Sequence, residues 1–141
     1  MGLLSKLFGK KEKKNTLKQD ILLASEWVVR ALNSSGYNAD YSLESMKEID
    51  RFFDEQNTPS GILAQNRGQI IFALGAYVGQ TAIKLYGGEW IADDNDPNGE
   101  IDISVRLADG STICPVIKCM KRYESGTEES IYAYLYVLGK K

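Results

Sequence analysis

The residues best suited to chemistry form one acidic loop, DDNDPNGEID, at positions 93–102. From Asp94 onward the loop follows the D-x-D-x-N-G spacing that opens a calcium-binding loop. Calcium needs several hard oxygens that converge from a sharply turned backbone, and this spacing offers them. The candidate metal ligands are therefore Asp94, Asp96, Asn98 and Asp102.

Three departures from the calcium pattern favour a structural role for this loop. Val105 occupies the twelfth position, where a calcium loop has a bidentate glutamate. Pro97 also stiffens the backbone, and the flanking segments are patterned as strands rather than helices. Because Asp, Asn and Gly form turns without a metal, we expect an acidic hairpin loop and no cofactor. Ca²⁺ is the alternative.

The chain contains no histidine. This excludes Ser-His-Asp and Cys-His catalysis, acid–base chemistry by histidine, and every zinc site that uses histidine. Two cysteines, Cys114 and Cys119, are too few for an all-cysteine zinc site. Catalysis would depend on a carboxylate such as Glu89 or Asp93, or on lysine or tyrosine. We therefore favour a protein that is not an enzyme.

Binding is the alternative role for the acidic residues. No basic residue interrupts positions 89–102, and such a negative surface attracts a basic partner and steers its approach. The other interpretation is that these charges only keep the protein soluble. The acidic balance argues against nucleic acid as a partner. The candidate binding residues are Tyr77, Glu89, Trp90, Asp93, Asp94 and Asp96.

Residues 1–14 form a basic amphipathic arm with a net charge of +4, against −6 for the remaining chain. On a helical wheel its apolar residues fall on one side and its lysines on the other, as in segments that enter the headgroup region of a membrane. The alternatives are a solubilising tail and a segment that packs on the body of the protein. The residues expected to contact a membrane are Leu3, Leu4, Lys6, Leu7, Phe8, Lys10 and Lys11.

Helical periodicity predicts three helices ahead of the acidic loop. The first covers 15–34 and begins with a Thr-x-x-Gln capping box. The second covers 42–56, with Ser42 as its N-cap. The third, around 70–86, is the most strongly patterned segment and the expected centre of the fold. Whether 60–68 joins it stays open.

Two glycines lie on the apolar side of the third helix, Gly75 and Gly79. A glycine inside a helix costs about 1 kcal/mol relative to alanine. We therefore expect another element to approach these glycines closely, and the first helix, with Trp27 in the middle of its apolar face, is the obvious candidate. Tyr77 falls on the opposite, more polar side of the third helix. Gly87 and the glycine after it end the helix.

The pattern then changes from a period of 3.6 to a period of 2. Segments 89–92, 100–107 and 112–120 are the predicted strands of an antiparallel meander. Pro115 cannot donate a ladder hydrogen bond, so we place the third strand at an edge or give it a bulge. The last segment, 127–138, fits either a helix or a strand, and its capping residues favour the helix.

The predicted architecture is an α+β domain over residues 15–141. Three N-terminal helices pack on a small antiparallel three-stranded meander, and a helix ends the chain. Hydrophobic residues make up 43% and charged residues 26%, as in ordinary soluble proteins. No run approaches the roughly 18 apolar residues of a membrane span. The cysteines are unlikely partners for each other at this spacing in one strand, so we expect reduced thiols and a cytoplasmic location.

One stretch carries a family resemblance. The string LGAYVGQTAIKLYGGEWI, preceded by SLESMKEIDRFFDEQ, resembles small bacterial domains from families of unknown function, in which a Leu-Gly-x-Tyr-x-Gly helix runs into Gly-Gly-x-Trp. The resemblance covers roughly residues 40–120, implies an α+β domain and a bacterial origin, and assigns no catalytic residue. The string KCMKRYESGTEESIYAYL is more loosely similar to bacterial immunity-type proteins, which bind and neutralise a partner.

Three hypotheses for function follow. The first is a cytoplasmic bacterial binding protein without catalytic activity, of the toxin-neutralising kind, that meets an unidentified protein partner through its acidic surface. The second is an accessory domain held peripherally at the inner face of the membrane by residues 1–14. The third is a carboxylate-based enzyme. The sequence does not indicate an oligomeric state.

Overall fold

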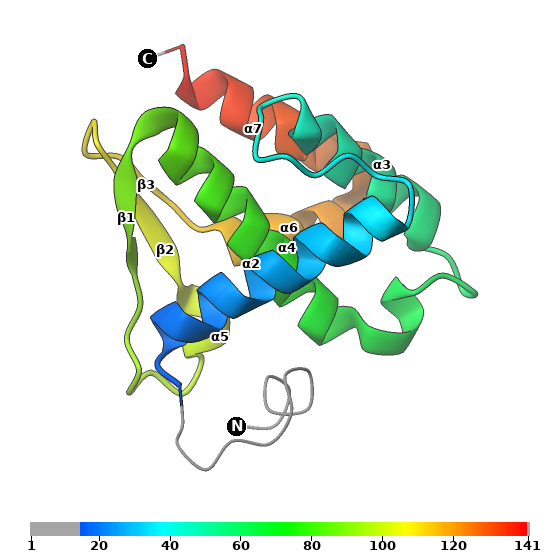
Figure 1. Cartoon of the computed structure of the whole chain (residues 1–141), viewed down its shortest axis with the longest axis horizontal. Coiled ribbons are helices and arrows are strands. Elements are labelled where there is room, and N and C mark those ends of the chain that lie inside the picture. The colour runs from blue at the N-terminus through cyan, green and yellow to red at the C-terminus, as the bar shows by residue number, and fades with distance from the viewer. Residues whose placement is uncertain (1–14, 141) are drawn as a thin grey trace.

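The computed structural model describes residues 15–140, so the arm and its expected membrane contacts lie outside the described residues. Helices surround one central helix, and a small antiparallel sheet closes one side (Figure 1). This confirms the α+β class, with helices before the sheet and a helix at the end of the chain. The elements are α2 (Leu17–Ser34), α3 (Ser45–Gln56), α4 (Leu63–Tyr86), β1 (Gly88–Ile91), α5 (Gly99–Asp102), β2 (Ser104–Leu107), β3 (Thr112–Ile113), α6 (Pro115–Ser125), the 3₁₀ helix η1 (Gly126–Glu129) and α7 (Ile131–Leu138).

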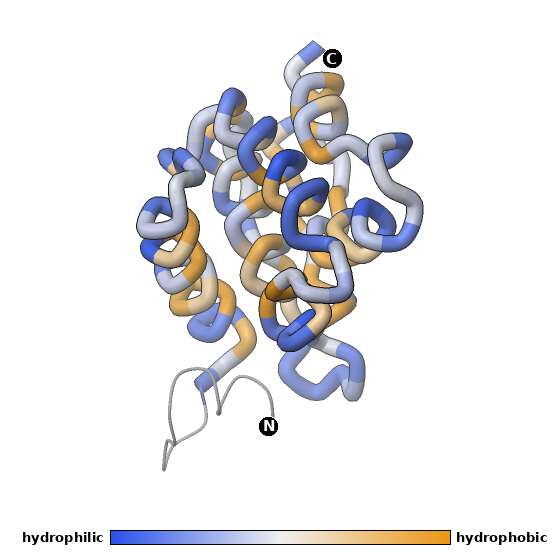
Figure 2. The backbone as a smooth tube through the Cα atoms, turned by 90° about the vertical axis from the view of Figure 1, so that its right-hand side faces the viewer, coloured by the Kyte–Doolittle hydropathy of each residue, from blue (hydrophilic) through white to orange (hydrophobic). Residues whose placement is uncertain are grey.

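Helix α4 is the centre of the fold, as expected. It packs against α2, α6 and the sheet, and every residue from Ile70 to Gly79 is buried. In Figure 2 the apolar residues gather where neighbouring helices face one another. Because this central stretch is covered on all sides, it has no polar face, and the expectation that Tyr77 belongs to a polar side of α4 is wrong. Tyr77 is fully buried.

The two glycines of α4 do meet close neighbours, as expected. A Cβ on Gly75 would lie 2.8 Å from the Cα and 3.0 Å from the backbone nitrogen of Val116, at the start of α6. A Cβ on Gly79 would lie 2.5 Å from Cζ2 of Trp90, in β1. The neighbours are therefore α6 and β1, and the expectation that the Trp27 helix fills this role is wrong.

The first two helices begin close to where the sequence places them. The hydroxyl of Thr16 accepts from the amide of Gln19 at 3.2 Å, and the Gln19 side chain accepts from the amide of Thr16 at 2.8 Å, which confirms the capping box. Helix α3 begins at Ser45 rather than directly after Ser42. The Ser42 hydroxyl still accepts from the Ser45 amide, at 3.1 Å.

The sheet is a meander in the order β1-β2-β3, with Trp90 opposite Val105 and Val105 opposite Ile113. The predicted third strand is mostly wrong, because β3 ends at Ile113 and the chain enters α6. Pro115 is the first residue of that helix, where its missing N–H has no helical partner to lose. The predicted second strand is also too long, since its first residues form α5.

Two open points of the sequence are resolved. Helix α4 begins at Leu63 and contains a kink at Asn66 (φ −138°, ψ 47°), so most of 60–68 belongs to it. The last segment is a helix, but its cap is Ser130, whose hydroxyl accepts from the amide of Ala133. Thr127 lies in η1 instead. Within residues 15–140, no helix has both the length and the apolar character that a membrane crossing requires.

One carboxylate joins three helices. Asp50 Oδ1, in α3, accepts from Nε of Arg122 in α6 at 2.8 Å and from the amide of Ile131 at 2.9 Å. Its Oδ2 accepts from the Ser130 hydroxyl and from the amide of Tyr132, each at 3.0 Å. Asp50 therefore satisfies first-turn amides of α7, where a negative charge is favourable. The Arg122 side chain is only 4% exposed.

Arg122 makes further contacts with α3. Its Nη2 donates to Asp54 Oδ1 at 2.8 Å and to the Asp50 carbonyl at 3.0 Å. A buried guanidinium loses its hydration, and these partners offset the cost of burying its charge. The group formed by Asp50, Asp54, Arg122 and Ser130 is named the α3–α6–α7 junction.

The junction predicts a large stability loss for Asp50→Ala. The substitution removes four hydrogen bonds and leaves the buried Arg122 charge with an incomplete set of partners, which costs about 3–5 kcal/mol of the free energy of unfolding. Urea denaturation measures it. Glu44→Ala is the control, because it breaks an exposed ion pair with Lys47 and should change stability little. A small loss for Asp50→Ala would contradict the role of the junction.

The close approach of α6 predicts that Gly75→Ala lowers the free energy of unfolding by about 1–3 kcal/mol through overpacking, although alanine is the better helix former. Adding Val116→Ala should restore little of this loss, because backbone atoms of Val116 remain in the way. Chemical denaturation of both variants checks this. Gln65→Ala, at an exposed position of the same helix, serves as the control. An unchanged free energy of unfolding for Gly75→Ala would contradict the close contact between α4 and α6.

Candidate binding site

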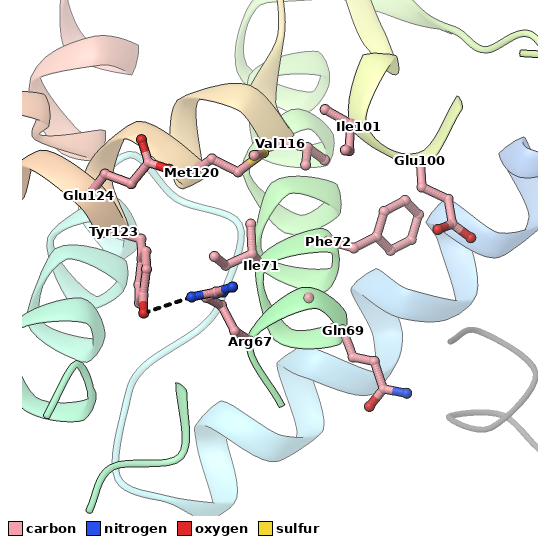
Figure 3. A pocket seen from close by; sticks show the side chains of 11 residues that line it. Arg67, Gln69, Ile71, Phe72, Glu100, Ile101, Val116, Met120, Tyr123 and Glu124 are labelled. Atoms are coloured by element: carbon pink, nitrogen blue, oxygen red, sulfur yellow. Dashed lines mark hydrogen bonds between the residues drawn. The ribbon is translucent and has the colours of Figure 1, made fainter. Parts of the chain in front are cut away.

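A pocket of about 310 Å³ opens between the start of α4, the short helix α5 and α6 (Figure 3). Its residues come from three segments that are distant in sequence. The lining residues are Arg67, Gly68, Gln69, Ile71, Phe72, Glu100, Ile101, Val116, Met120, Tyr123 and Glu124.

Helical spacing places these side chains on facing surfaces. Val116, Met120 and Tyr123 stand four and three residues apart, which puts them on one face of α6. Residues 67, 68, 71 and 72 do the same on α4, directly after the kink at Asn66. The single turn of α5 adds the third wall. The pocket is therefore a groove between two helices, closed at one side by α5.

The deep part of the pocket is apolar. Ile71, Phe72 and Val116 are buried, and Met120 is half-buried beside them. Ile101 lines the same space but is 40% exposed, which is high for an isoleucine. Its side chain extends the apolar lining from the buried walls to the edge of the cavity.

The charges of the pocket lie at its ends. Nη1 of Arg67 donates to the hydroxyl of Tyr123 at 3.2 Å, and its guanidinium lies 5.3 Å from the centre of that ring. Glu100 comes from the opposite side and points toward α2 (Figure 3). Burial raises the pKa of Glu100, and the negative charge of Asp20 in α2 raises it further. Glu124 is exposed next to Tyr123.

Two of the predicted binding residues belong to the core. Trp90 is buried, and its indole Nε1 donates to Gln80 Oε1 at 2.6 Å. The hydroxyl of Tyr77 accepts from the amide of Tyr41 at 2.9 Å and shares a 2.6 Å hydrogen bond with the hydroxyl of Ser45. Neither side chain is presented to a partner, so their assignment to a binding surface is wrong. Tyr77 is covered because residues 70–79 of α4 are buried on all sides, and Trp90 is covered because its ring packs against Gly79 of that helix.

The acidic loop between β1 and β2 positions the start of α2. Asp94 Oδ1 accepts from the amide of Leu17 at 2.8 Å, which satisfies a first-turn N–H of α2. Asp93 and Asp96 accept from amides two residues later, at 2.9 and 2.8 Å, as in Asx turns. Glu89, Asp93 and Asp94 are exposed, but none of the three lines the pocket. The predicted acidic residues are therefore close in the chain without forming the cavity.

The proposed calcium ligands are arranged for turns. A hydrogen bond with Asp96 raises the pKa of Asp102, and the negative charge of that carboxylate raises it further. Asp102 ends α5, so a helical turn follows the loop instead of the expected strand. Among residues 15–140, no three His, Cys, Asp or Glu side chains are grouped closely enough to hold a metal ion.

Both cysteines are free. Cys119 is fully buried in α6, and burial raises its pKa to about 12, so the thiol is unreactive. Cys114 precedes Pro115 and is half-buried.

Sequence analysis missed the pocket because it assigned 112–120 to a strand. The signal that could have found it is the helical spacing of Val116, Met120 and Tyr123. The contribution of Glu100 and Ile101 had no local signal, since their place beside α4 comes from the fold. Comparison of the chain with models of protein families, with curated proteins and with solved structures found no match.

The environment of Glu100 predicts a pH-dependent effect on stability. A native pKa above that of the unfolded chain means that the folded state holds the proton more tightly. The stability of the wild-type protein relative to Glu100→Gln should therefore fall as the pH rises through the interval above about 4.3, the ordinary pKa of glutamate.

Urea denaturation of both proteins between acidic and neutral pH measures this difference. Glu26→Gln is the matched control, because Glu26 lies on the exposed face of α2. If Glu100→Gln is the less stable protein at neutral pH, and increasingly so with rising pH, then Glu100 is stabilised as an anion and the assignment of its environment is wrong.

Proposed function

We propose that this protein is a non-catalytic binding protein, and that its pocket receives apolar side chains from a positively charged segment of a protein partner. One observation carries the proposal: the groove between α4 and α6 has apolar walls and carboxylates at its edge. Each part of this description selects a property of the partner.

The apolar walls select apolar side chains. The cavity of about 310 Å³ is at the small end of the range for ligand sites, which suits a few side chains of a peptide. A groove between two helices is also the usual receptor for an amphipathic helix. Ile101 at the edge would be covered by such a partner, and covering its exposed 40% would contribute part of the about 1.5–3 kcal/mol that full burial of an isoleucine gives.

The edge of the pocket selects positive charge. Glu100 and Glu124 bring carboxylates, while the cation of Arg67 is held against Tyr123. Asp93 and Asp94 add exposed negative charge on the loop that leads into α5. Such a field raises the rate at which a basic partner meets the site and favours it over an acidic one.

The resemblance to immunity-type proteins makes neutralisation of a toxin one specific form of this proposal, with the pocket as the contact. Two free cysteines support a reducing, cytoplasmic location. An accessory domain held at the inner membrane face by residues 1–14 remains a second form. Sedimentation with anionic vesicles tests it, because tethering requires that binding depend on Leu7 and Phe8.

A carboxylate-based enzyme is the other candidate, and one observation favours it. Glu100 combines a place in a pocket with a raised pKa, which is a property of general acids. This candidate predicts that a panel of ester, glycoside and phosphoester substrates includes one whose turnover Glu100→Gln abolishes. If the Glu100→Gln variant still turns over the substrate, Glu100 is not the catalytic acid.

The binding proposal predicts that amphipathic basic peptides bind this pocket and that Ile101→Asn weakens them roughly tenfold or more, as expected for the loss of an apolar contact of at least 1.4 kcal/mol. A peptide library screened against the full chain supplies the ligands, and fluorescence anisotropy measures affinity. Acidic peptides of the same apolar pattern should bind more weakly.

Ile91→Asn is the matched control, because Ile91 is 38% exposed, close to the 40% of Ile101, and lies on β1 outside the pocket. Glu100→Gln combined with Glu124→Gln should reduce both the affinity and its dependence on salt. Equal losses for the Ile101 and Ile91 variants would contradict binding at this site.

A further inference from the structure

We propose that the resting occupant of the pocket is the N-terminal arm of the same chain, residues 1–14. Its apolar residues would lie against the walls of the groove and its lysines would face the acidic edge. This inference rests on the binding role proposed for the pocket, and it names a segment that the described structure leaves out. The apolar residues concerned are Leu3, Leu4, Leu7 and Phe8.

The point where the arm joins the body places it beside the pocket. Leu17, the first residue of α2, lies against Gly99: a Cβ on that glycine would be 2.7 Å from Leu17 Cδ1. Gly99 is followed by Glu100 and Ile101, which line the pocket. Figure 1 shows the start of α2 beside α5. Asp94 fixes the start of α2 by accepting a hydrogen bond from the Leu17 amide.

The arm is long enough to reach every wall. Fourteen residues span roughly 45 Å when extended and roughly 20 Å as a helix. The near wall, α5, begins at the residue that Leu17 contacts. Either conformation therefore covers the distance across a cavity of about 310 Å³, and no change in the body of the protein is needed.

The charges of the arm and of the pocket are opposite. Residues 1–14 carry +4 and the remaining chain −6. At the end of the pocket nearest to the arm, Glu100 is half-buried and feels the negative charge of Asp20, which is 4% exposed in the first turn of α2. A lysine at this end would offset the repulsion between the two carboxylates.

The apolar pattern of the arm also matches the groove. Leu3, Leu4, Leu7 and Phe8 follow the i, i+1, i+4, i+5 spacing of one helical face. The groove offers two facing helix surfaces with the exposed Ile101 at its edge. An amphipathic helix in a groove of this kind buries the same residues that would otherwise enter a membrane.

Docking within one chain gives the arm an advantage over any partner. A short tether supplies an effective concentration in the millimolar range. A partner that uses the pocket must displace the arm, and a membrane that takes up the arm must empty the pocket. The arm would thus make partner binding and membrane binding depend on one another.

Methyl NMR on the full chain tests this directly, with the methyl signals of Ile101 and Met120 as probes of the pocket. The test variant is the double substitution Leu7→Asp with Phe8→Asp, which should shift both signals and leave Ile91 unchanged. The control is Ser5→Asp with Gly9→Asp, which adds the same charge and keeps the apolar residues. It should leave the pocket signals at their wild-type positions.

Unchanged Ile101 and Met120 signals in the test variant would overturn the proposal. Wild-type signals that move on dilution would also overturn it, because they would assign the pocket to the arm of a second copy. If the test variant loses sedimentation with anionic vesicles while its pocket signals stay in place, the arm serves the membrane and does not dock.

A synthetic peptide of residues 1–14 gives a second readout. It should bind the test variant, whose pocket is free, roughly tenfold more tightly than wild type, if its dissociation constant is about 0.1 mM and the effective concentration about 1 mM. Equal affinities overturn docking. If library peptides still require Ile101 in that case, the binding function stands and only the arm is excluded as occupant.

Discussion

The arrangement of the helices depends on the carboxylate of Asp50. Arg122 is buried, and the cost of taking its charged guanidinium out of water is offset by the carboxylates and the carbonyl around it. Asp50 supplies most of those partners and also satisfies the first amides of α7. One side chain of α3 therefore fixes the end of α6 and the start of α7 together. Asp50 also affects the position of one wall of the pocket, because α6 forms that wall.

Close packing at α4 sets the other limit on the pocket. The backbone of Val116 lies against Gly75, and the side chain of Val116 lines the cavity. Two turns of α4 therefore have different neighbours: at Gly75 the helices nearly touch, and near Ile71 and Phe72 a space opens between them. The kink at Asn66 and the turn of α5 enclose this space. The candidate site therefore exists because α6 touches α4 at Gly75 and lies farther from it near Ile71 and Phe72.

The acidic residues divide into two groups with different roles. Asp94 and its neighbours form turns and hold the start of α2, so their charge is partly committed to the fold. Glu100 and Glu124 stand at the edge of an apolar cavity, where we propose that their charge favours a basic ligand. The first group also anchors the start of α2, which lies beside Gly99, the residue that precedes Glu100. The turns formed by the acidic loop and the edge of the pocket at Glu100 are therefore neighbouring parts of the fold.

Local signals in the sequence determined those elements whose stability is itself local. The capping box at Thr16 set the start of α2, and glycines on one side of α4 required close neighbours, because caps and missing side chains act within one turn. Tertiary structure decided the rest. Nothing near Asp50 indicates a partner 72 residues away, and the pattern of one helix cannot show that Tyr77 is covered by another. The pattern of 112–120 predicts a strand, whereas the chain forms α6 from Pro115 onward and packs Val116 against Gly75 of α4. This contact is tertiary, and nothing within 112–120 indicates Gly75 as a neighbour.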